Sequence, residues 1–155
     1  MPSFMDFPVV KLTEELERCR VAWRELPANE HRSWFLRWME VYKDFHAPER
    51  RRLRGARAMA EAQSLCRGSF VLIPCRNPSS KAWSAVGKAY ACEGSVLPDL
   101  TEVSHLVDVF ISPFDLSWTL LYGHEVDVFG GPEFSCAVWF CQPSAERALR
   151  RESNR

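Results

Sequence analysis

The residues of this chain best suited to chemistry are a histidine and the acids beside it. His124 and Glu125 follow an apolar segment, and Asp127 comes two residues later. Imidazole titrates near neutral pH and a neighbouring carboxylate can orient its ring, so His124 with Glu125 or Asp127 could supply the acid–base catalysis of a small hydrolase or isomerase. His105 and Asp108 could assist. A histidine beside an acid can equally be a structural hydrogen-bonding group, and the spacing leaves both interpretations open.

Other catalytic patterns are missing. His124, Asp127 and Glu133 could form a three-ligand metal site only through a favourable turn, and the helical His-Glu-x-x-His motif is absent. The chain has no Gly-x-Ser-x-Gly elbow, no P-loop and no Gly-x-Gly-x-x-Gly. We therefore expect no metal ion and no cofactor.

The cysteines do not form a recognisable metal or disulfide framework. None of the six is part of a Cys-x-x-Cys pair, and most lie in apolar runs. Such cysteines behave as small buried hydrophobes in a reducing compartment. We predict buried free thiols at Cys19, Cys66, Cys75, Cys92, Cys136 and Cys141.

Charge is segregated along the chain. The whole sequence is neutral, with 20 basic and 20 acidic residues, yet no Lys or Arg occurs from Ala89 to Glu146. A field of one sign repels nucleic acid and attracts basic partners. We therefore predict a protein-binding module with an acidic face, such as a bacterial immunity or antitoxin-like protein that neutralises a basic toxin. Its predicted contacts are Asp99, Glu102, Asp108, Asp115, Asp127 and Glu133, with Phe114 or Phe129 as an apolar anchor.

The dense basic segment is Arg50–Arg57. As a helix it would place Arg50, Arg54 and Arg57 on one face, which could grip phosphates. The alternative, which we favour because no aromatic residues interleave with the arginines, is a solvated face that pairs with the acidic half. Nucleic acid is therefore an unlikely partner.

The hydrophobic pattern predicts three helices followed by strands. The helices would span 11–26, about 29–45 with an aromatic face (Trp34, Phe35, Trp38, Met39, Tyr42, Phe45), and 48–66. Strands are expected at 69–75, 87–92 and 134–140, with a hairpin of 105–112 and 116–122. This order indicates an α+β domain at 1–142, with the three helices on one face of a four- to five-stranded, mainly antiparallel sheet. A polar, partly disordered tail would follow at 143–155.

No apolar run approaches the ~20 residues of a membrane span, and the start of the chain lacks a basic region typical of a signal peptide. We expect a cytoplasmic protein without membrane contact. The oligomeric state stays open.

Three short segments carry a resemblance. Asp115-Leu116-Ser117-Trp118-Thr119, His124-Glu125 and Gly131-Pro132-x-Phe134 resemble the end of a family of small bacterial domains, which has a Trp-Thr strand, a His-Glu pair and a Gly-Pro-Tyr-Phe turn. Glu133 stands at the tyrosine position of that pattern. The resemblance implies an α+β fold and a bacterial source, and the family carries no established activity.

Overall fold

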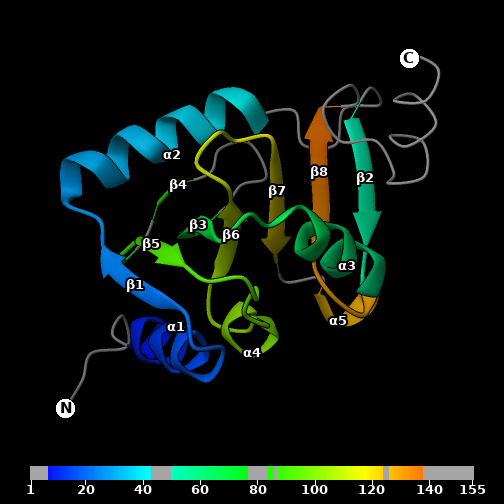
Figure 1. Cartoon of the computed structure of the whole chain (residues 1–155), viewed down its shortest axis with the longest axis horizontal. Helices are drawn as coiled ribbons and strands as arrows, with labels where there is room; N and C mark the ends of the chain where they lie inside the picture. The colour runs from blue at the N-terminus through cyan, green and yellow to red at the C-terminus, as the bar shows by residue number, and fades with distance from the viewer. Residues whose placement is uncertain (1–6, 43–49, 77–83, 86, 124–125, 138–155) are drawn as a thin grey trace.

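A computed structural model describes residues 7–42, 50–76, 84–85, 87–123 and 126–137. Within these ranges the chain forms five helices and eight strands, so the α+β class is confirmed (Figure 1). The helices are α1 (Phe7–Arg18), α2 (Ala28–Tyr42), α3 (Ala56–Leu65), α4 (Thr101–Ser104) and α5 (Val126–Phe129). The strands are β1 (Ala22–Glu25), β2 (Arg50–Arg54), β3 (Ser69–Arg76), β4 (Ser84–Ala85), β5 (Tyr90–Glu93), β6 (Asp108–Ser112), β7 (Trp118–Tyr122) and β8 (Glu133–Ala137).

All strand pairs are antiparallel, as expected. Seven strands follow the order β1-β5-β3-β6-β7-β8-β2, and β4 pairs with β3. The predicted hairpin is present as β6 and β7, with Phe110 opposite Leu121. The sheet is wider than the four or five strands expected, because two segments that we assigned to helices are its edge strands.

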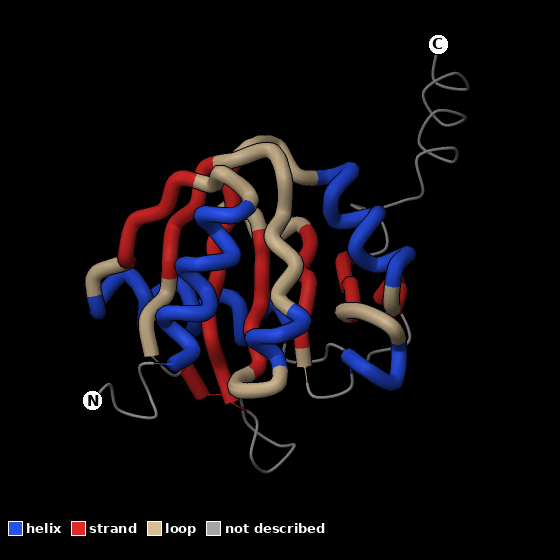
Figure 2. Tube along the Cα trace, turned by 90° about the horizontal axis from the view of Figure 1, so that it is seen from below, coloured by secondary structure: helices blue, strands red, loops and turns tan. Residues whose placement is uncertain are grey.

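Helices cover both faces of this sheet, so the expectation of three helices on one face is wrong. Alternate residues of each strand point to opposite sides. Phe70 and Leu72 pack with Leu12 of α1, Ala62 of α3 and the residues around them. Val71, Ile73 and Phe110 pack instead with the aromatic residues of α2. We call these sides the α1 face and the α2 face; seen from below, α1 and α4 lie in front of the strands (Figure 2).

The aromatic stripe of α2 is core, as predicted. Trp38 and Tyr42 are fully buried, and the Trp38 ring stacks on Phe110 with 3.5 Å between centroids. The Trp38 indole Nε1 donates a hydrogen bond to the Thr119 hydroxyl at 3.0 Å, and the Tyr42 hydroxyl donates to the Leu116 carbonyl at 2.7 Å. These bonds satisfy the polar tips of large side chains that would otherwise be costly to bury. Phe45, the last member of the predicted stripe, lies outside the described residues.

The first predicted helix ends earlier than its hydrophobic pattern indicated. The chain leaves α1 at Arg18, and Arg20 adopts a positive φ of 56° that reverses its direction. Residues Ala22–Glu25 then pair with β5, with Trp23 opposite Cys92. A segment this short fits the helical and the strand pattern equally well, and its pairing with a neighbouring strand makes it a strand.

The third predicted helix is a strand followed by a shorter helix. Arg50–Arg54 pairs with β8, so that Leu53 faces Phe134 and packs against the core. Gly55, with φ of 70°, then turns the chain into α3, whose buried residues are Ala58 and Ala62. Arg50, Arg54 and Arg57 therefore do not share a helical face.

Two turns meet at the end of the sheet where β2 and β8 pair. The Gly55 amide donates to the Pro132 carbonyl at 2.9 Å, and the Gly131 amide donates to the Val126 carbonyl at 2.9 Å. A Cβ at Gly55 would lie 2.5 Å from the Phe129 carbonyl oxygen, and one at Gly131 would lie 2.9 Å from the Gly55 Cα. Only glycine permits this approach, which fixes α5 against the start of α3.

Three further expectations concern free thiols, membrane-spanning helices and the tail of the chain. Five described cysteines are free: Cys75, Cys92 and Cys136 are buried, and Cys19 and Cys66 are half-buried. No helix in the described ranges is long and apolar enough to cross a membrane. Cys141 and the predicted tail at 143–155 lie outside those ranges.

Candidate functional site

The predicted catalytic group falls mostly outside the part of the chain that the structure describes. His124 and Glu125 are not among the described residues, so their predicted role stays a prediction. Asp127 lies in the first turn of the short helix α5 and is paired with His105, whose Nε2 lies 3.1 Å from the Asp127 Oδ2. Sequence reasoning had placed His105 nearby as a helper, and the two are joined because α4 contacts α5.

In the His105–Asp127 pair the carboxylate orients the imidazole ring, but both side chains are exposed to solvent. The side chains are 47% and 70% exposed, so water screens their attraction and the pair holds little energy. Among the described residues His105 makes no hydrogen bond to a hydroxyl or thiol that it could activate as a nucleophile. The arrangement leaves the Asp127 carboxylate accessible to solvent.

Three of the predicted acidic contacts gather at one end of the molecule. Asp99 and Glu102, at the start of α4, and Asp127, in α5, are all exposed. We call this set the acidic end; it lies along the lower side of Figure 1, where α4 and α5 approach. The Asp99 carboxylate also accepts hydrogen bonds from the amide and hydroxyl of Thr101, at 3.0 and 2.7 Å, which fixes its direction.

Asp99 also acts on groups beneath it. Burial, with a contribution from the negative charge of Asp99, raises the pKa of the Tyr122 phenol well above its usual range. Burial and the charge of Glu15 raise the pKa of the Cys19 thiol. Both groups therefore stay neutral at physiological pH and add no charge beneath the acidic end, and Arg18, whose charge also acts on Cys19, is paired with Glu15.

Other predicted contacts do not belong to this set. Glu133 is paired with Arg54, whose Nε lies 3.2 Å from the Glu133 Oε1, because β2 and β8 place the two residues opposite each other. The same guanidinium covers the Phe129 ring at 4.2 Å from its centroid. Both residues are thus occupied by Arg54, and Phe129 is not an open apolar anchor.

Phe114 and Asp115 lie in the turn between β6 and β7, at the opposite end of that hairpin from Asp108. The Asp115 carboxylate accepts a hydrogen bond from the Ser117 amide at 3.0 Å and remains exposed. The Phe114 ring packs edge-to-face on Trp34, with centroids 6.0 Å apart. The two strands separate them from the acidic end, so the six predicted acids do not form one continuous face. Asp108 is half-buried at the start of β6.

One pair, Arg54–Glu133, joins the basic segment to the acidic half as the favoured interpretation held, although the segment begins as a strand and not as a helix. Besides the Arg54–Glu133 pair, the Arg51 Nη1 lies 3.0 Å from the Glu61 Oε1. β2 is an edge strand of the sheet, and its arginines contact α3 and β8. Charged side chains on an edge strand hinder its pairing with other chains. Arg57 in α3 is exposed.

Sequence reasoning missed one residue of this region. Val128 lies between Asp127 and Phe129 and is 79% exposed, the largest exposure among the large hydrophobic residues described. The sequence gives no signal of this exposure, because a single valine in an apolar segment is typical of a buried position. In the described ranges no group of three or more His, Cys, Asp or Glu side chains is arranged to hold a metal ion.

Comparisons with known proteins add no relative: no family model, no curated protein and no solved structure matches this chain. The resemblance of its last strands to a bacterial domain family therefore stays a prediction.

Proposed function

We propose that this protein is a binding module that recognises a basic protein through its acidic end. The observation that carries the proposal is the convergence of Asp99, Glu102 and Asp127 from two touching helices, within a stretch that contains no Lys or Arg. α4 and α5 carry no Lys or Arg, and the basic side chain paired with Asp127 is His105, directly after α4. The nearby arginines Arg18 and Arg54 are paired with Glu15 and Glu133, so a cationic surface approaching here would meet a net attraction.

The arrangement also offers an apolar contact. Val128 is exposed beside Asp127, so a partner could bury it while its own Lys or Arg side chains reach the surrounding carboxylates. Interfaces commonly combine a buried apolar centre with a charged rim. Val128 replaces Phe114 and Phe129 in this role, since Phe114 is distant and Phe129 is covered by Arg54.

The class of partner follows from the charge. Proteins that hold nucleic acid are cationic, and nucleases used as toxins are examples. Our proposal therefore includes a bacterial immunity or antitoxin-like role in the cytoplasm, in which the acidic end occupies the basic surface of the toxin. Nucleic acid itself would be repelled by the same carboxylates.

The proposal can be tested with a catalytically inactive basic ribonuclease as the probe, measuring its association rate with the chain at low and high NaCl. We expect faster association at low salt, and a drop of about 10-fold in that rate for a D99N/E102Q/D127N variant. The matched control is E25Q/E30Q/D115N, which changes net charge by the same amount with exposed acids located elsewhere. Equal rates for the two variants would show that the acidic end has no special role and would overturn the proposal.

The enzymatic alternative has less support. A hydrolase or isomerase would need His124 with Glu125 or Asp127, and of these only Asp127 is described, paired with His105. The His105–Asp127 pair is the one observation in its favour, and within the described residues it has no nucleophile beside it.

A further inference from the structure

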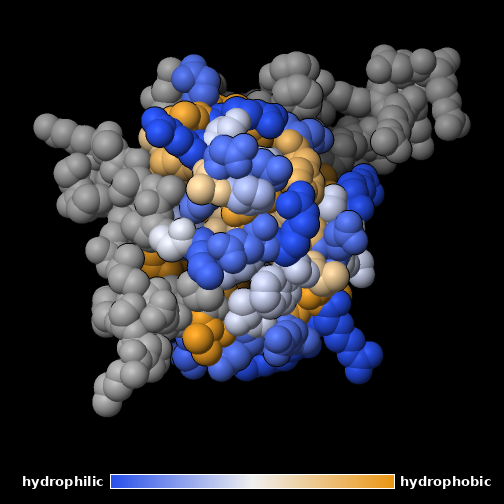
Figure 3. All heavy atoms as spheres, turned by 90° about the vertical axis from the view of Figure 1, so that its left-hand side faces the viewer, coloured by the Kyte–Doolittle hydropathy of each residue, from blue (hydrophilic) through white to orange (hydrophobic). Residues whose placement is uncertain are grey.

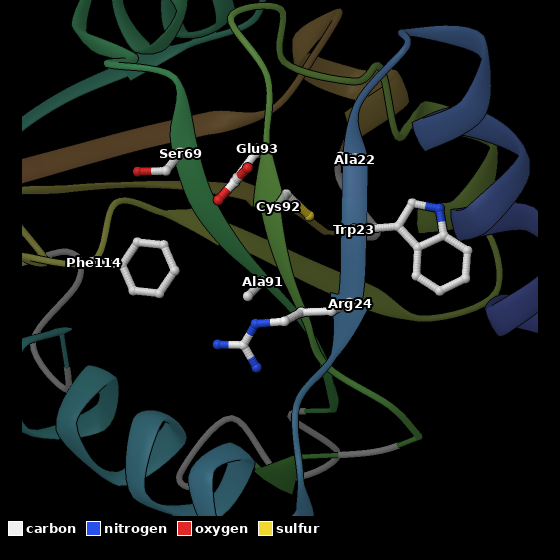
Figure 4. A pocket seen from close by; sticks show the side chains of 8 residues that line it. All are labelled: Ala22, Trp23, Arg24, Ser69, Ala91, Cys92, Glu93 and Phe114. Atoms are coloured by element: carbon white, nitrogen blue, oxygen red, sulfur yellow. The ribbon is translucent and has the colours of Figure 1, made fainter.

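A second polar site lies on the α2 face, at the edge of the sheet that β1 forms. A hollow of about 270 Å³ opens there, above β1, β5 and β3 (Figure 4). Register explains its floor: Ala22 lies opposite Glu93, Arg24 lies opposite Ala91, and alternation puts all four on the same side of the sheet. Elsewhere this face carries large side chains packed under α2, whereas the small side chains of Ala22 and Ala91 leave space above the sheet here.

The walls of the hollow are chemically mixed. Phe114, from the turn between β6 and β7, is 42% exposed and closes one side, and its contact with Trp34 holds the ring in place. The Ser69 hydroxyl and the Glu93 carboxylate lie along another side, and the Arg24 guanidinium reaches over Ala91 (Figure 4). The Trp23 side chain points away from the hollow.

The two charges of the hollow do not neutralise each other. Arg24 and Glu93 occupy diagonal positions on neighbouring strands, a spacing that long side chains can bridge. In the described part of the chain no ion pair joins them, and Arg24 has only a long contact of 3.8 Å with Glu30. The Arg24 side chain is 63% exposed, and Glu93 is exposed as well. A cation and an anion thus face the same space from different positions.

We propose that this hollow binds a small zwitterion of the α-amino acid class. The carboxylate of such a ligand fits the Arg24 guanidinium, its ammonium group fits the Glu93 carboxylate with the Ser69 hydroxyl, and an apolar side chain fits the Phe114 ring. A nucleotide is disfavoured, because its several negative charges would meet one cation and one anion. The volume lies below the ~300–1,000 Å³ of sites for drug-sized ligands, which also favours a small molecule.

The surroundings agree with a polar ligand rather than a second protein chain. On the side of the molecule that carries β1, hydrophilic side chains predominate and hydrophobic ones form separate small patches (Figure 3). The hollow shares none of its lining residues with the acidic end, so this inference is independent of the proposed function.

The test uses nuclear magnetic resonance titrations of the ¹⁵N-labelled full chain with L-phenylalanine, N-acetyl-L-phenylalanine and L-phenylalanine amide. The second probe lacks the ammonium charge and the third lacks the carboxylate. We expect saturable shifts of the Arg24, Glu93 and Phe114 amides with L-phenylalanine, and binding about 10-fold weaker for each analogue, since each loses one charge-assisted contact. Equal binding of the three probes, or no saturable shift at these amides with L-phenylalanine, would overturn the proposal.

Two variants separate the roles of the charges. Arg24→Gln should weaken L-phenylalanine binding about 10-fold and leave binding of the amide unchanged, while Glu93→Gln should weaken L-phenylalanine and leave the N-acetyl analogue unchanged. The control is Glu25→Gln, because Glu25 lies next to Arg24 on the same strand but alternates to the other face and pairs with Lys88. Weakening by Glu25→Gln as large as that by Arg24→Gln would show a general charge effect and refute the assigned contacts.

Discussion

The contact between two glycine turns predicts how strongly a single methyl group destabilises the fold. Gly55 has φ of 70° and ψ of −141°, a region that only glycine adopts readily, and Gly130 also has φ of 70°. A Cβ at Gly130 would meet nothing within 4 Å, whereas one at Gly55 would lie 2.5 Å from the Phe129 carbonyl oxygen. Gly130→Ala is therefore a control that places a Cβ at the same positive φ without the clash.

The clash sets the expected difference. Relieving it requires backbone movement of the kind that overpacking imposes, at a cost of ~1–3 kcal/mol. The same movement weakens the 2.9 Å bond from the Gly55 amide to the Pro132 carbonyl, with a net contribution of ~1 kcal/mol. We expect Gly55→Ala to lower the free energy of unfolding by about 2–4 kcal/mol more than Gly130→Ala does.

Urea denaturation followed by tryptophan fluorescence measures both variants, with unchanged m-values as the check that the comparison is valid. Equal destabilisation by the two substitutions would mean that the turns do not meet, and would refute this account of the sheet end. Since the contact also fixes α5, Gly55→Ala should further slow association with the basic probe at low salt, and Gly130→Ala should slow it less.

Three further predictions concern titration, reactivity and charge. Burial lowers the pKa of His31, whose Nε2 has no hydrogen-bond partner among the described residues, so the unfolded chain binds its proton first. Stability should therefore fall as pH drops below about 6.5, and His31→Gln should flatten that part of a pH–stability curve. Burial raises the pKa of Cys92 to about 12, so iodoacetamide at pH 8 should modify it only after denaturation, as peptide mass spectrometry can check. Arg54→Ala uncovers the Glu133 carboxylate and should speed association with the basic probe more than Arg57→Ala, which changes net charge equally; equal rates would contradict a local effect.

Local patterns predicted those parts of the fold whose packing follows the nearby sequence. The aromatic spacing of Trp34, Phe35 and Trp38 predicts the buried side of α2. Alternation at Val107, Val109 and Ile111 predicts that these three residues share one side, and all three pack in the cluster of the α1 face. In both cases the residues that repeat are large and apolar, so burial leaves few alternatives.

The failures come from segments whose structure depends on distant partners. Ala22–Glu25 and Arg50–Arg54 are short and charged, and each is a strand because it completes an edge of the sheet, against β5 and β8 respectively. Leu116 shows the same dependence on a smaller scale. Leu116 alternates with Trp118 and Leu120 in the sequence, a pattern that predicts one shared side, but a positive φ of 60° turns Leu116 into the cluster on the α2 face.

The same reasoning explains why the acidic face was only partly predicted. A count of charges along the chain establishes that Ala89–Glu146 lacks cations, but it cannot say which cations come from elsewhere. The pairing of β2 with β8 joins residues that are far apart in sequence and places Arg54 opposite Glu133, which removes one predicted contact. Asp127 is 70% exposed beside His105, the residue that follows α4, and among the described residues no arginine pairs with it. The attraction of this end for a basic partner is therefore set by strand pairing as much as by composition.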